Sequence, residues 1–379
     1  TKGMAYIKTT ANMEIQRKNF TDIFQFLMQN DRLTKQNIVT ALHLSLPTVT
    51  QNINALCQQG LAREAGTRGN TGGRRAMTYS FNDDARIAIG VDVTRNHVAI
   101  VAVNLRGSVF YKERVRKKFE PTDEYYRYLG EVVQHCIDQL HYPKERILGV
   151  GIGVPGLVTA DNQTVFYGEI LHFTGETCAN MSRYIPYPTA LLNDANAAGF
   201  AETWINKKIK TAFYLMLSNN IGGAVIIDGA PYSGYHHHSG EVGHICIERN
   251  GRQCYCGQRG CVDRYLAATE LSDLTDGRLI DFFALLEQKD PRAMRCWDTY
   301  LDDLALTNHN VHMLFDCPII LGGYVGEFIA PYMDEIRRRT AALDPFEPNA
   351  DYLHACHYRT EAIAAGSALH FIVKFLETV

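Results

Sequence analysis

The feature that most constrains the fold is a change of pattern near Ile87. Before this residue the sequence shows three helical patterns in close succession, and after it strand and helix patterns alternate. Such alternation is typical of α/β domains, in which helices cover a largely parallel sheet. We therefore expect a small N-terminal domain over residues 1–82 and an α/β body over residues 83–379.

Length and composition agree with a globular protein of more than one domain. The 379 residues exceed what one ordinary core organises, and 46% of them are hydrophobic. No apolar run approaches the roughly 20 residues of a membrane span. The polar stretch Thr1–Phe20 lacks the apolar core of a secretion signal, so we expect a cytoplasmic protein with no membrane span.

Charge is distributed unevenly along the chain. Residues 1–80 hold ten Lys and Arg against four Asp and Glu, a net charge of +6, which leaves −9 for the rest of a chain whose total is −3. A basic N-terminal domain on an acidic body suits a polyanionic partner at that domain alone. Chance clustering would give the same numbers, so further evidence is needed.

The N-terminal domain has the pattern of a winged helix-turn-helix. Thr34 and Ser45 are suited to cap the second and third helices, and Gly60 is suited to end the third. A glycine- and arginine-rich tip over residues 66–75 then separates two strand-like stretches, which together predict a β-hairpin wing. The expected helices and strands are Ile15–Met28, Thr34–His43, Leu46–Gln59, Leu61–Glu64 and Ala76–Phe81.

Side chains of the third helix and the wing are suited to contact double-stranded DNA. Short polar side chains on the exposed face of the helix can reach base edges and phosphates in a major groove. Two arginines after Gly72-Gly73 can enter a minor groove or bind phosphate. The predicted DNA contacts are Thr48, Thr50, Gln51, Asn54, Arg74 and Arg75. A winged helix that binds protein, with a solvated polar face, is the alternative.

In the body, several buried strands end in residues suited to bind a ligand. Carboxyl ends of strands are where α/β sheets bind ligands, so we expect these loops to form the site. Helices are expected over Asp123–Leu140 and Ala195–Ile205, and a loop containing Gly222-Gly223 after Leu217. The expected strands are Ile87–Val93, Val98–Asn104, Ser108–Val115, Ile147–Val154, Thr189–Asn193, Ala212–Leu217 and Pro318–Leu321.

Four motifs of the body resemble the ROK family, which contains bacterial sugar kinases and sugar-responsive repressors. They are Gly153-Val154-Pro155-Gly156, Leu192-Asn193-Asp194-Ala195-Asn196, Gly240-Glu241-Val242-Gly243-His244 and Cys254-Tyr255-Cys256-Gly257-Gln258-Arg259-Gly260-Cys261. The resemblance implies a two-lobed, actin/hexokinase-like (ribonuclease H-like) α/β fold. We expect a small lobe over residues 83–193 plus 366–379, and a large lobe over residues 194–365. The winged helix before them is typical of the family's transcriptional regulators.

One imidazole and three thiols form a potential metal site. His244, Cys254, Cys256 and Cys261 make a complete tetrahedral set with no position left for a reactant. The resemblance implies one structural zinc ion per chain that holds the sugar loop. The alternative is three reduced cysteines near an unrelated histidine. We treat His236, His237 and His238 as loop residues near the sugar, because consecutive residues of an irregular loop rarely converge on one ion.

The resemblance also implies a binding site for a monosaccharide or an amino sugar. Its expected residues are Pro155, Gly156, Asn193, Asp194, Glu241, His244 and Asp263. Asp263 stands where the family usually has glutamate, and its side chain is one methylene shorter. Asp194 would be the general base of a family kinase, and it could equally be the N-cap of the helix that follows it.

Both glycine-rich phosphate loops of the family's kinases are altered in this sequence. Asp92-Val93-Thr94-Arg95-Asn96-His97 stands for D-x-G-G-T-K, and Ser218-Asn219-Asn220-Ile221-Gly222-Gly223 stands for G-T-G-I-G-G. Without these glycines the backbone approaches phosphate less closely. We therefore expect a non-catalytic, sugar-responsive transcriptional regulator that acts as a repressor, in which Asp194 is a vestigial base.

Two other functions stay open at this point. One is a sugar kinase with a regulatory DNA-binding domain, and the other is an interaction protein without a ligand. A homodimer is expected because paired DNA-binding domains must meet two half-sites on a palindromic operator.

Overall fold

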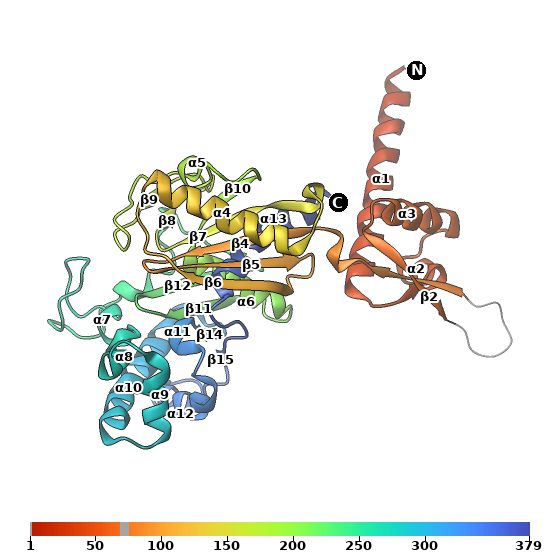
Figure 1. Cartoon of the computed structure of the whole chain (residues 1–379). Coiled ribbons are helices and arrows are strands. Elements are labelled where there is room, and N and C mark those ends of the chain that lie inside the picture. The colour runs from red at the N-terminus through yellow and green to blue at the C-terminus, as the bar shows by residue number, and fades with distance from the viewer. Residues whose placement is uncertain (1, 69–75) are drawn as a thin grey trace. The chain divides into compact units, whose positions relative to one another are not determined.

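The computed structural model describes residues 2–68 and 76–379 (Figure 1). They form two compact units, which are described separately. The head unit contains the chain up to Ile87 together with residues 104–106 and 372–379, and the body unit contains residues 88–103 and 107–371. The division of the body into lobes over residues 83–193 plus 366–379 and over residues 194–365 remains a prediction.

Up to Phe81, the described residues of the head unit form three α-helices and a three-stranded sheet in the order β1-β3-β2. Thr34 accepts a hydrogen bond from the Asn37 amide at the start of α2, and Ser45 accepts one from the Thr48 amide at the start of α3, as expected. The apolar faces of the helices bury Ile23, Ile38 and Ile53 completely. The elements are α1 (Lys2–Gln29), β1 (Leu33–Thr34), α2 (Lys35–Leu42), α3 (Leu46–Gln58), β2 (Ala62–Arg68) and β3 (Ala76–Phe81).

The first sheet of the body has the strand order β10-β7-β4-β5-β6. Every residue of β4 is buried, whereas β6 alternates half-buried and exposed residues, so β4 lies inside the sheet and β6 at its edge. The predicted strands are all present. The elements of this half are β4 (Ile87–Val93), β5 (His97–Asn104), β6 (Val109–Arg116), α4 (Asp123–Leu140), β7 (Ile147–Val154), β8 (Leu157–Val158), β9 (Val165–Tyr167), α5 (Cys178–Met181) and β10 (Thr189–Asn193).

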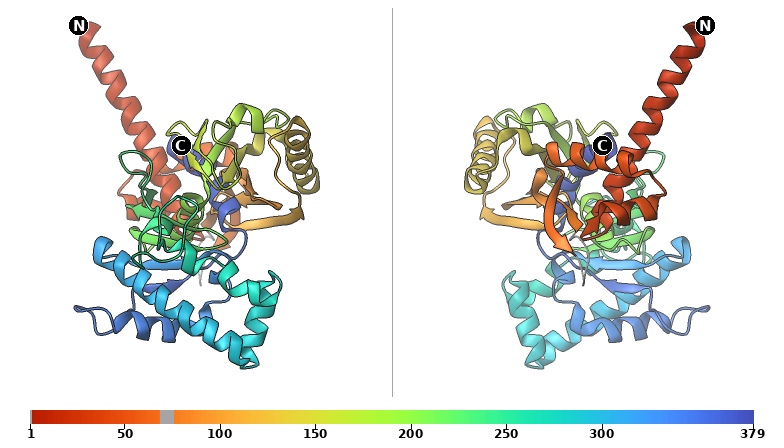
Figure 2. Two further views of the ribbon diagram at one scale, coloured as in Figure 1. Left: turned by 90° about the vertical axis from the view of Figure 1, so that its left-hand side faces the viewer. Right: turned by 90° about the vertical axis from the view of Figure 1, so that its right-hand side faces the viewer.

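The second sheet has the strand order β13-β12-β11-β14-β15. Helices α9, α10 and α12, coloured cyan to blue, gather on the side of this sheet away from the first (Figure 2). The elements are α6 (Asp194–Ile205), β11 (Ala212–Leu217), β12 (Ile221–Ile227), β13 (Ala230–Pro231), α7 (Asp263–Leu266), α8 (Thr269–Ser272), α9 (Leu279–Glu287), α10 (Pro291–Phe315), β14 (Ile319–Gly322), α11 (Gly323–Gly326), α12 (Met333–Ala341), β15 (Leu353–Ala355) and α13 (Ala362–Thr378).

One expectation about the second sheet was wrong. Gly222 and Gly223, predicted in a loop, pair with Met216 and Leu215 inside the antiparallel strands β11 and β12. A Cβ atom at Gly223 would lie 2.6 Å from the Gly240 carbonyl oxygen. The glycine is therefore needed for a close approach of two backbones within a strand.

Helix α13 packs closely against both the first sheet and helix α6. A Cβ atom at Gly151 of β7 would lie 2.0 Å from the Ser367 carbonyl oxygen, and one at Gly366 would lie 1.8 Å from that of Ala197. Helix α6 in turn packs on β11 and β12 of the second sheet. The two helices therefore join the two sheets into one body. Among the described residues no helix has the length and apolarity to span a membrane.

Candidate functional site

The loops at the carboxyl ends of five strands meet around one cavity of about 870 Å³, here called the inner cavity. The loops follow β4, β7, β10, β11 and β14, as the sequence predicted. Their lining residues include Thr94–Asn96, Pro155, Asp194, Ser218–Asn220 and Gly323.

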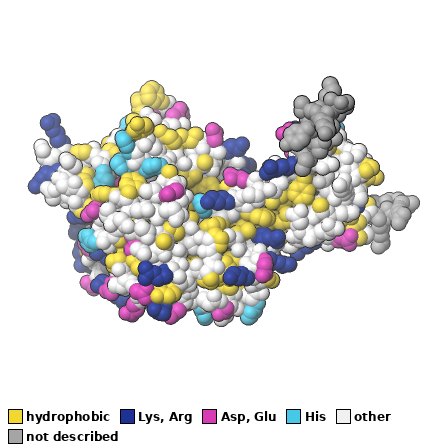
Figure 3. Space-filling model, turned by 90° about the horizontal axis from the view of Figure 1, so that it is seen from above, with side chains coloured by type: hydrophobic (Ala, Val, Ile, Leu, Met, Phe, Trp, Pro, Cys, Tyr) yellow, Lys and Arg dark blue, Asp and Glu magenta, His cyan; other side chains and the backbone are white. Residues whose placement is uncertain are grey.

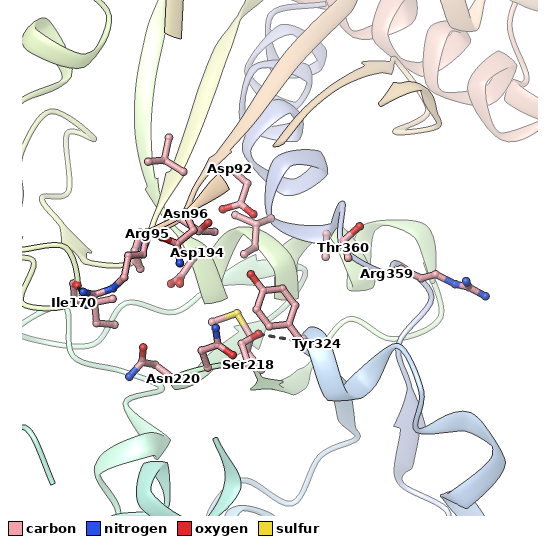
Figure 4. A pocket seen from close by; sticks show the side chains of 18 of the residues that line it. Asp92, Arg95, Asn96, Ile170, Asp194, Ser218, Asn220, Tyr324, Arg359 and Thr360 are labelled. Carbon is pink, nitrogen blue, oxygen red and sulfur yellow. Dashed lines mark hydrogen bonds between the residues drawn. The ribbon is translucent and has the colours of Figure 1, made fainter. Parts of the chain in front are cut away.

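Two carboxylates face the inner cavity (Figure 4). Burial raises the pKa of Asp92 to about 7, the charge of Asp194 adds to the rise, and Arg114 opposes it. Asp194 is half-buried as a residue, but desolvation of its carboxyl raises its pKa to about 7 as well. The Asp92 Oδ1 atom is buried without a hydrogen-bond partner. The pair therefore shares less than two full negative charges near neutral pH.

The loop after β4 is a tight turn at the edge of the inner cavity. The Thr94 amide donates to the His97 carbonyl oxygen at 3.0 Å, and the His97 amide donates to the Thr94 hydroxyl at 3.1 Å. The Arg95 guanidinium reaches the Ile170 carbonyl oxygen at 2.5 Å (Figure 4). A cationic side chain thus occupies the region where the family's kinases have glycine.

A second cavity of about 560 Å³, here called the outer cavity, adjoins the first. The two share Pro155, Ile170, Asp194, Met216 and Asn220. Six of the seven residues predicted to bind sugar line the outer cavity: Pro155, Gly156, Asn193, Asp194, Glu241 and His244. Their assignment to a sugar stays a prediction.

Asn193, not Asp194, is the N-cap of helix α6. The Asn193 side-chain oxygen accepts from the Asn196 amide at 2.9 Å, and its amide nitrogen donates to the Gly156 carbonyl oxygen at 3.1 Å. Asp194 is the first helical residue, and its Oδ1 atom accepts from the Ala195 amide at 2.8 Å. The cap fixes Asn193, so the carboxylate of Asp194 is held at the cavity wall.

The seventh predicted sugar ligand, Asp263, does not line either cavity. It is buried, and its Oδ1 atom accepts a hydrogen bond from the Ile221 amide at 2.8 Å. Burial raises the pKa of Asp263, while this hydrogen bond opposes the rise. The short side chain thus holds the β11–β12 loop, whose Asn220 lines both cavities.

The outer cavity has lining residues that sequence reasoning missed: Tyr167, Glu169, Asn220 and Tyr255. Tyr255 stands between Cys254 and Cys256, so its position in the cysteine motif could have indicated that it lies near the sugar site. Tyr167 and Glu169 belong to a segment for which the sequence showed no strand pattern. Glu241 is exposed as a residue, yet desolvation of its carboxyl raises its pKa, and His244 and His238 oppose the rise.

The four predicted metal ligands converge. The ligand atoms of His244, Cys254, Cys256 and Cys261 all lie within 4.8 Å of one another. The Cys254 Sγ to His244 Nδ1 distance is 3.9 Å, and the Cys256 Sγ to Cys261 Sγ distance is 3.7 Å. A tetrahedron with zinc–sulfur bonds of about 2.3 Å has edges of roughly 3.8 Å, so the arrangement fits a zinc ion.

Backbone geometry supports the cysteine loop. Gly257 and Gly260 both have positive φ, of 89° and 78°. A Cβ atom at Gly260 would lie 1.8 Å from the Glu248 carbonyl oxygen, so only glycine fits there. Cys246, which the sequence interpretation left aside, pairs through its backbone with Cys261 and lies outside the four-ligand group.

Four of the six predicted DNA-contacting residues lie on helix α3 of the head unit. Gln51 and Asn54 of α3 are exposed, and Thr48 and Thr50 are half-buried. The Thr48 hydroxyl lies 2.8 Å from the Ser45 hydroxyl and therefore belongs to the N-cap of α3. Arg74 and Arg75 lie outside the described residues.

Residues 88–372 match the sequence profile of the ROK family. The chain belongs to the ROK family. Residues 21–63 match a profile for winged helix-turn-helix DNA-binding domains, in agreement with α2, α3 and the start of the wing. This ROK protein thus combines the two parts that the change of pattern near Ile87 predicted.

Both repressors and kinases are among its relatives. It is 26% identical over 259 residues to the xylose repressor of Bacillus subtilis (strain 168), covering 68% of this chain and 67% of the repressor. The match to the xylose repressor of Caldicellulosiruptor bescii covers 63% of that protein. An N-acetyl-D-glucosamine kinase of Erwinia tasmaniensis is 27% identical over 305 residues, 74% of this chain and 98% of the kinase. These alignments span about two thirds of the repressors' own length.

Solved structures support the same fold. A ROK family transcriptional regulator described as a homologue of the E. coli MLC protein aligns with a TM-score of 0.71 at 18% identity, covering 95% of this chain and 99% of that one. A ROK family glucokinase from Streptomyces griseus, in complex with glucose and AMPPNP, has a TM-score of 0.63 at 22% identity and covers 75% of this chain and 98% of its own. The actin/hexokinase-like body preceded by a winged helix-turn-helix is thereby confirmed.

Proposed function

We propose that this ROK protein is a sugar-responsive, DNA-binding transcriptional repressor of carbohydrate-metabolism genes. The observation that carries the proposal is the presence, in one chain, of a winged helix-turn-helix and a carboxylate-lined cavity in a sugar-kinase-like body. The xylose repressors to which it is similar have a regulatory function by name.

The outer cavity is the proposed sugar site. Sugar hydroxyls donate to carboxylates and accept from amides, and the Asp194 and Glu241 carboxylates supply acceptors on this wall. We assign His244 Nδ1, which lies 3.9 Å from Cys254 Sγ, to the metal. Nε2 lies 3.4 Å from the Tyr255 hydroxyl, so a sugar hydroxyl at Nε2 would share that atom with Tyr255.

We assign one structural zinc ion to His244, Cys254, Cys256 and Cys261. All four ligand positions are filled by protein atoms, so the ion would hold the loop and would not activate water. Val262 donates its amide to the Ile245 carbonyl oxygen at 2.9 Å, which ties the cysteine loop to the segment that carries Glu241. Zinc would therefore order one side of the sugar site.

A non-catalytic body is the finer part of the proposal. The Thr94 and His97 amides are both used in hydrogen bonds within the turn over residues 94–97, and the turn carries Arg95, which supports the proposal that this loop does not cradle phosphate. One observation favours the alternative of a sugar kinase with a regulatory head, because Asp92 and Asp194 both face the inner cavity. Measured ADP release decides between the two.

Two elements connect the cavity to the head unit through the chain itself. Helix α13 begins at Ala362 and Ile363, which line the inner cavity, and its last residues belong to the head unit. Strand β5 begins beside Asn96, another lining residue, and leads into residues 104–106 of the head unit. The expected small lobe covers residues 83–193 plus 366–379, and the expected large lobe covers residues 194–365. A sugar that draws these two lobes together would displace both α13 and β5.

The proposed regulator acts as a homodimer on a palindromic operator, because each head can occupy one half-site. Allosteric couplings of this kind are about 1–3 kcal/mol, or about 5- to 150-fold in operator affinity. To test the proposal, operator sequences are selected from random DNA with the full chain, and binding is then titrated with sugars. The proposal is refuted if the chain selects no DNA sequence. It is also refuted if no sugar changes the affinity of the chain for the selected DNA.

A further inference from the structure

The two ends of the outer cavity differ in character. One end is shared with the inner cavity and contains Asp194 and Pro155, which are half-buried. The other end, beside the cysteine loop, contains Tyr167 and Tyr255. These side chains are 41% and 49% exposed although they line a cavity, so the second end opens to solvent through two aromatic rings.

The Tyr255 ring is held in place from its hydroxyl end. Its hydroxyl lies 3.4 Å from His244 Nε2, and the two rings meet edge to face with centroids 5.3 Å apart. Because the contact uses the hydroxyl and one edge, part of the ring stays exposed. The position of Tyr255 between Cys254 and Cys256 limits its movement further.

Tyr167 reaches the same mouth from strand β9. Burial raises the pKa of its hydroxyl, and the nearby carboxylates and cysteine thiolates, including Glu241 and Cys256, raise it further. Tyr167 lines the outer cavity together with Tyr255 of the cysteine loop, although the two residues are far apart in the sequence. Its neighbour Phe166 stacks on His238 with ring centroids 6.2 Å apart. Histidine and hydrophobic side chains lie together on one face of the body in Figure 3.

A sugar ring has polar edges and a less polar face formed by its C–H groups. The edges bind carboxylates and amides, whereas the face packs on exposed aromatic rings. Contiguous exposed hydrophobic surface with a polar rim is typical of ligand-binding grooves. A single sugar bound through Asp194 and Glu241 lies within the outer cavity. The rings of Tyr167 and Tyr255, at the open end of the cavity, can then contact a group attached to that sugar.

We propose that Tyr167 and Tyr255 form a second sugar subsite, and that the effector is an oligosaccharide. Its first residue fills the outer cavity, and its next residue packs on the two tyrosine rings. This inference rests on the proposed function and specifies the ligand of the same site.

The test compares matched ligands on the full chain by calorimetry. Each of glucose, xylose, galactose and mannose is measured with its methyl glycoside and with its own homodisaccharides. For the sugar that binds, we expect a disaccharide to bind about tenfold or more tightly than the methyl glycoside, from two aromatic contacts of roughly 0.5–1.5 kcal/mol each. Tyr167→Ala should weaken binding of the disaccharide several times more than binding of the methyl glycoside, so that the ratio falls severalfold.

Three further variants separate stacking from other effects. Tyr167→Phe keeps the ring and should keep the ratio, and Tyr235→Ala removes a tyrosine that is 92% exposed but lines neither cavity, so it should change nothing. Tyr255→Ala should act like Tyr167→Ala, and its metal content is measured because it lies between two ligands. Equal affinities for disaccharide and methyl glycoside, or a ratio that survives both alanine variants, would overturn the inference. If no sugar of any length binds, the proposed function itself fails.

Discussion

Asp92 is one of the two carboxyl groups of the inner cavity whose pKa is raised to about 7. Its pKa of about 7 in the folded protein lies above the model-peptide value near 3.9, so the folded state binds more protons between about pH 4 and pH 7. Stability from this group is therefore lost as the pH rises through that window. We expect Asp92→Asn to stabilise the protein by about 1–4 kcal/mol at pH 8 and to have no effect at pH 4. Denaturant unfolding at the two pH values measures this.

The exposed carboxylate of Asp351 is the matched control, and Asp351→Asn should leave the unfolding free energy nearly unchanged at both pH values. A loss of stability at pH 8 in Asp92→Asn would contradict the prediction. It would mean that the carboxylate has a favourable partner in the folded protein, with Arg114 the first one to consider.

At the scale of elements, helix α3 is the proposed recognition helix. Gln51 and Asn54 are exposed on it, so their removal should not unfold the head. Each good base contact contributes about 1–3 kcal/mol of discrimination. We expect Gln51→Ala with Asn54→Ala to weaken binding to the selected operator by at least tenfold in fluorescence anisotropy. Gln58→Ala, at the exposed end of the same helix, is the control. An unchanged operator affinity in the double variant would show that Gln51 and Asn54 of α3 do not contact the bases of the operator.

The wing tip needs a separate measurement. Arg74 and Arg75 are predicted from the sequence to bind phosphate or the minor groove. Their joint replacement by alanine should weaken binding to every DNA sequence and flatten its salt dependence. A salt dependence equal to that of the wild type would exclude the wing from the interface.

Helix α13 gives a prediction about coupling. Its first turn lines the inner cavity, and residues 372–379 belong to the head unit. A chain ending at Phe371 should still bind sugar, because the cavity residues are intact. Its operator affinity should change less than twofold when sugar is added. A full sugar response in the truncated chain would show that coupling does not pass through α13.

The sequence predicted the elements whose pattern is local. Strand β4, helix α4 and strand β7 have their predicted bounds, because long buried runs and a helical period stand out in a single chain. Strand β12 was missed because Gly222-Gly223 resembles a loop, and the reason for these glycines is the approach of Gly240 from elsewhere. The position of Asp263 was equally hidden, because its hydrogen-bond partner Ile221 is far away in the sequence.

At the scale of the whole molecule, the metal ion is expected to connect the cysteine loop with the sugar response. Elemental analysis of the native protein should find about one zinc per chain, from the ligand count. Cys256→Ser should lose the metal and the sugar response together, whereas Cys246→Ser, at an exposed cysteine outside the group, should keep both. A metal-free native protein with a full sugar response would contradict the zinc assignment.

The last prediction separates a switch from an enzyme. Asp194 faces both cavities, so a repressor needs it to hold the sugar, and a kinase needs it as the base. We expect Asp194→Asn to reduce the sugar response while leaving operator affinity without sugar near that of the wild type. In the native protein, ATP should change neither the affinity for sugar nor the response. ADP release is measured with the sugars that bind, and the Asp194→Asn variant provides the background. Turnover of order 1 per second or faster, lost in Asp194→Asn, would make the protein a kinase with a regulatory head. It would also show that phosphate can bind at Arg95 and Asn219 without the family's glycines.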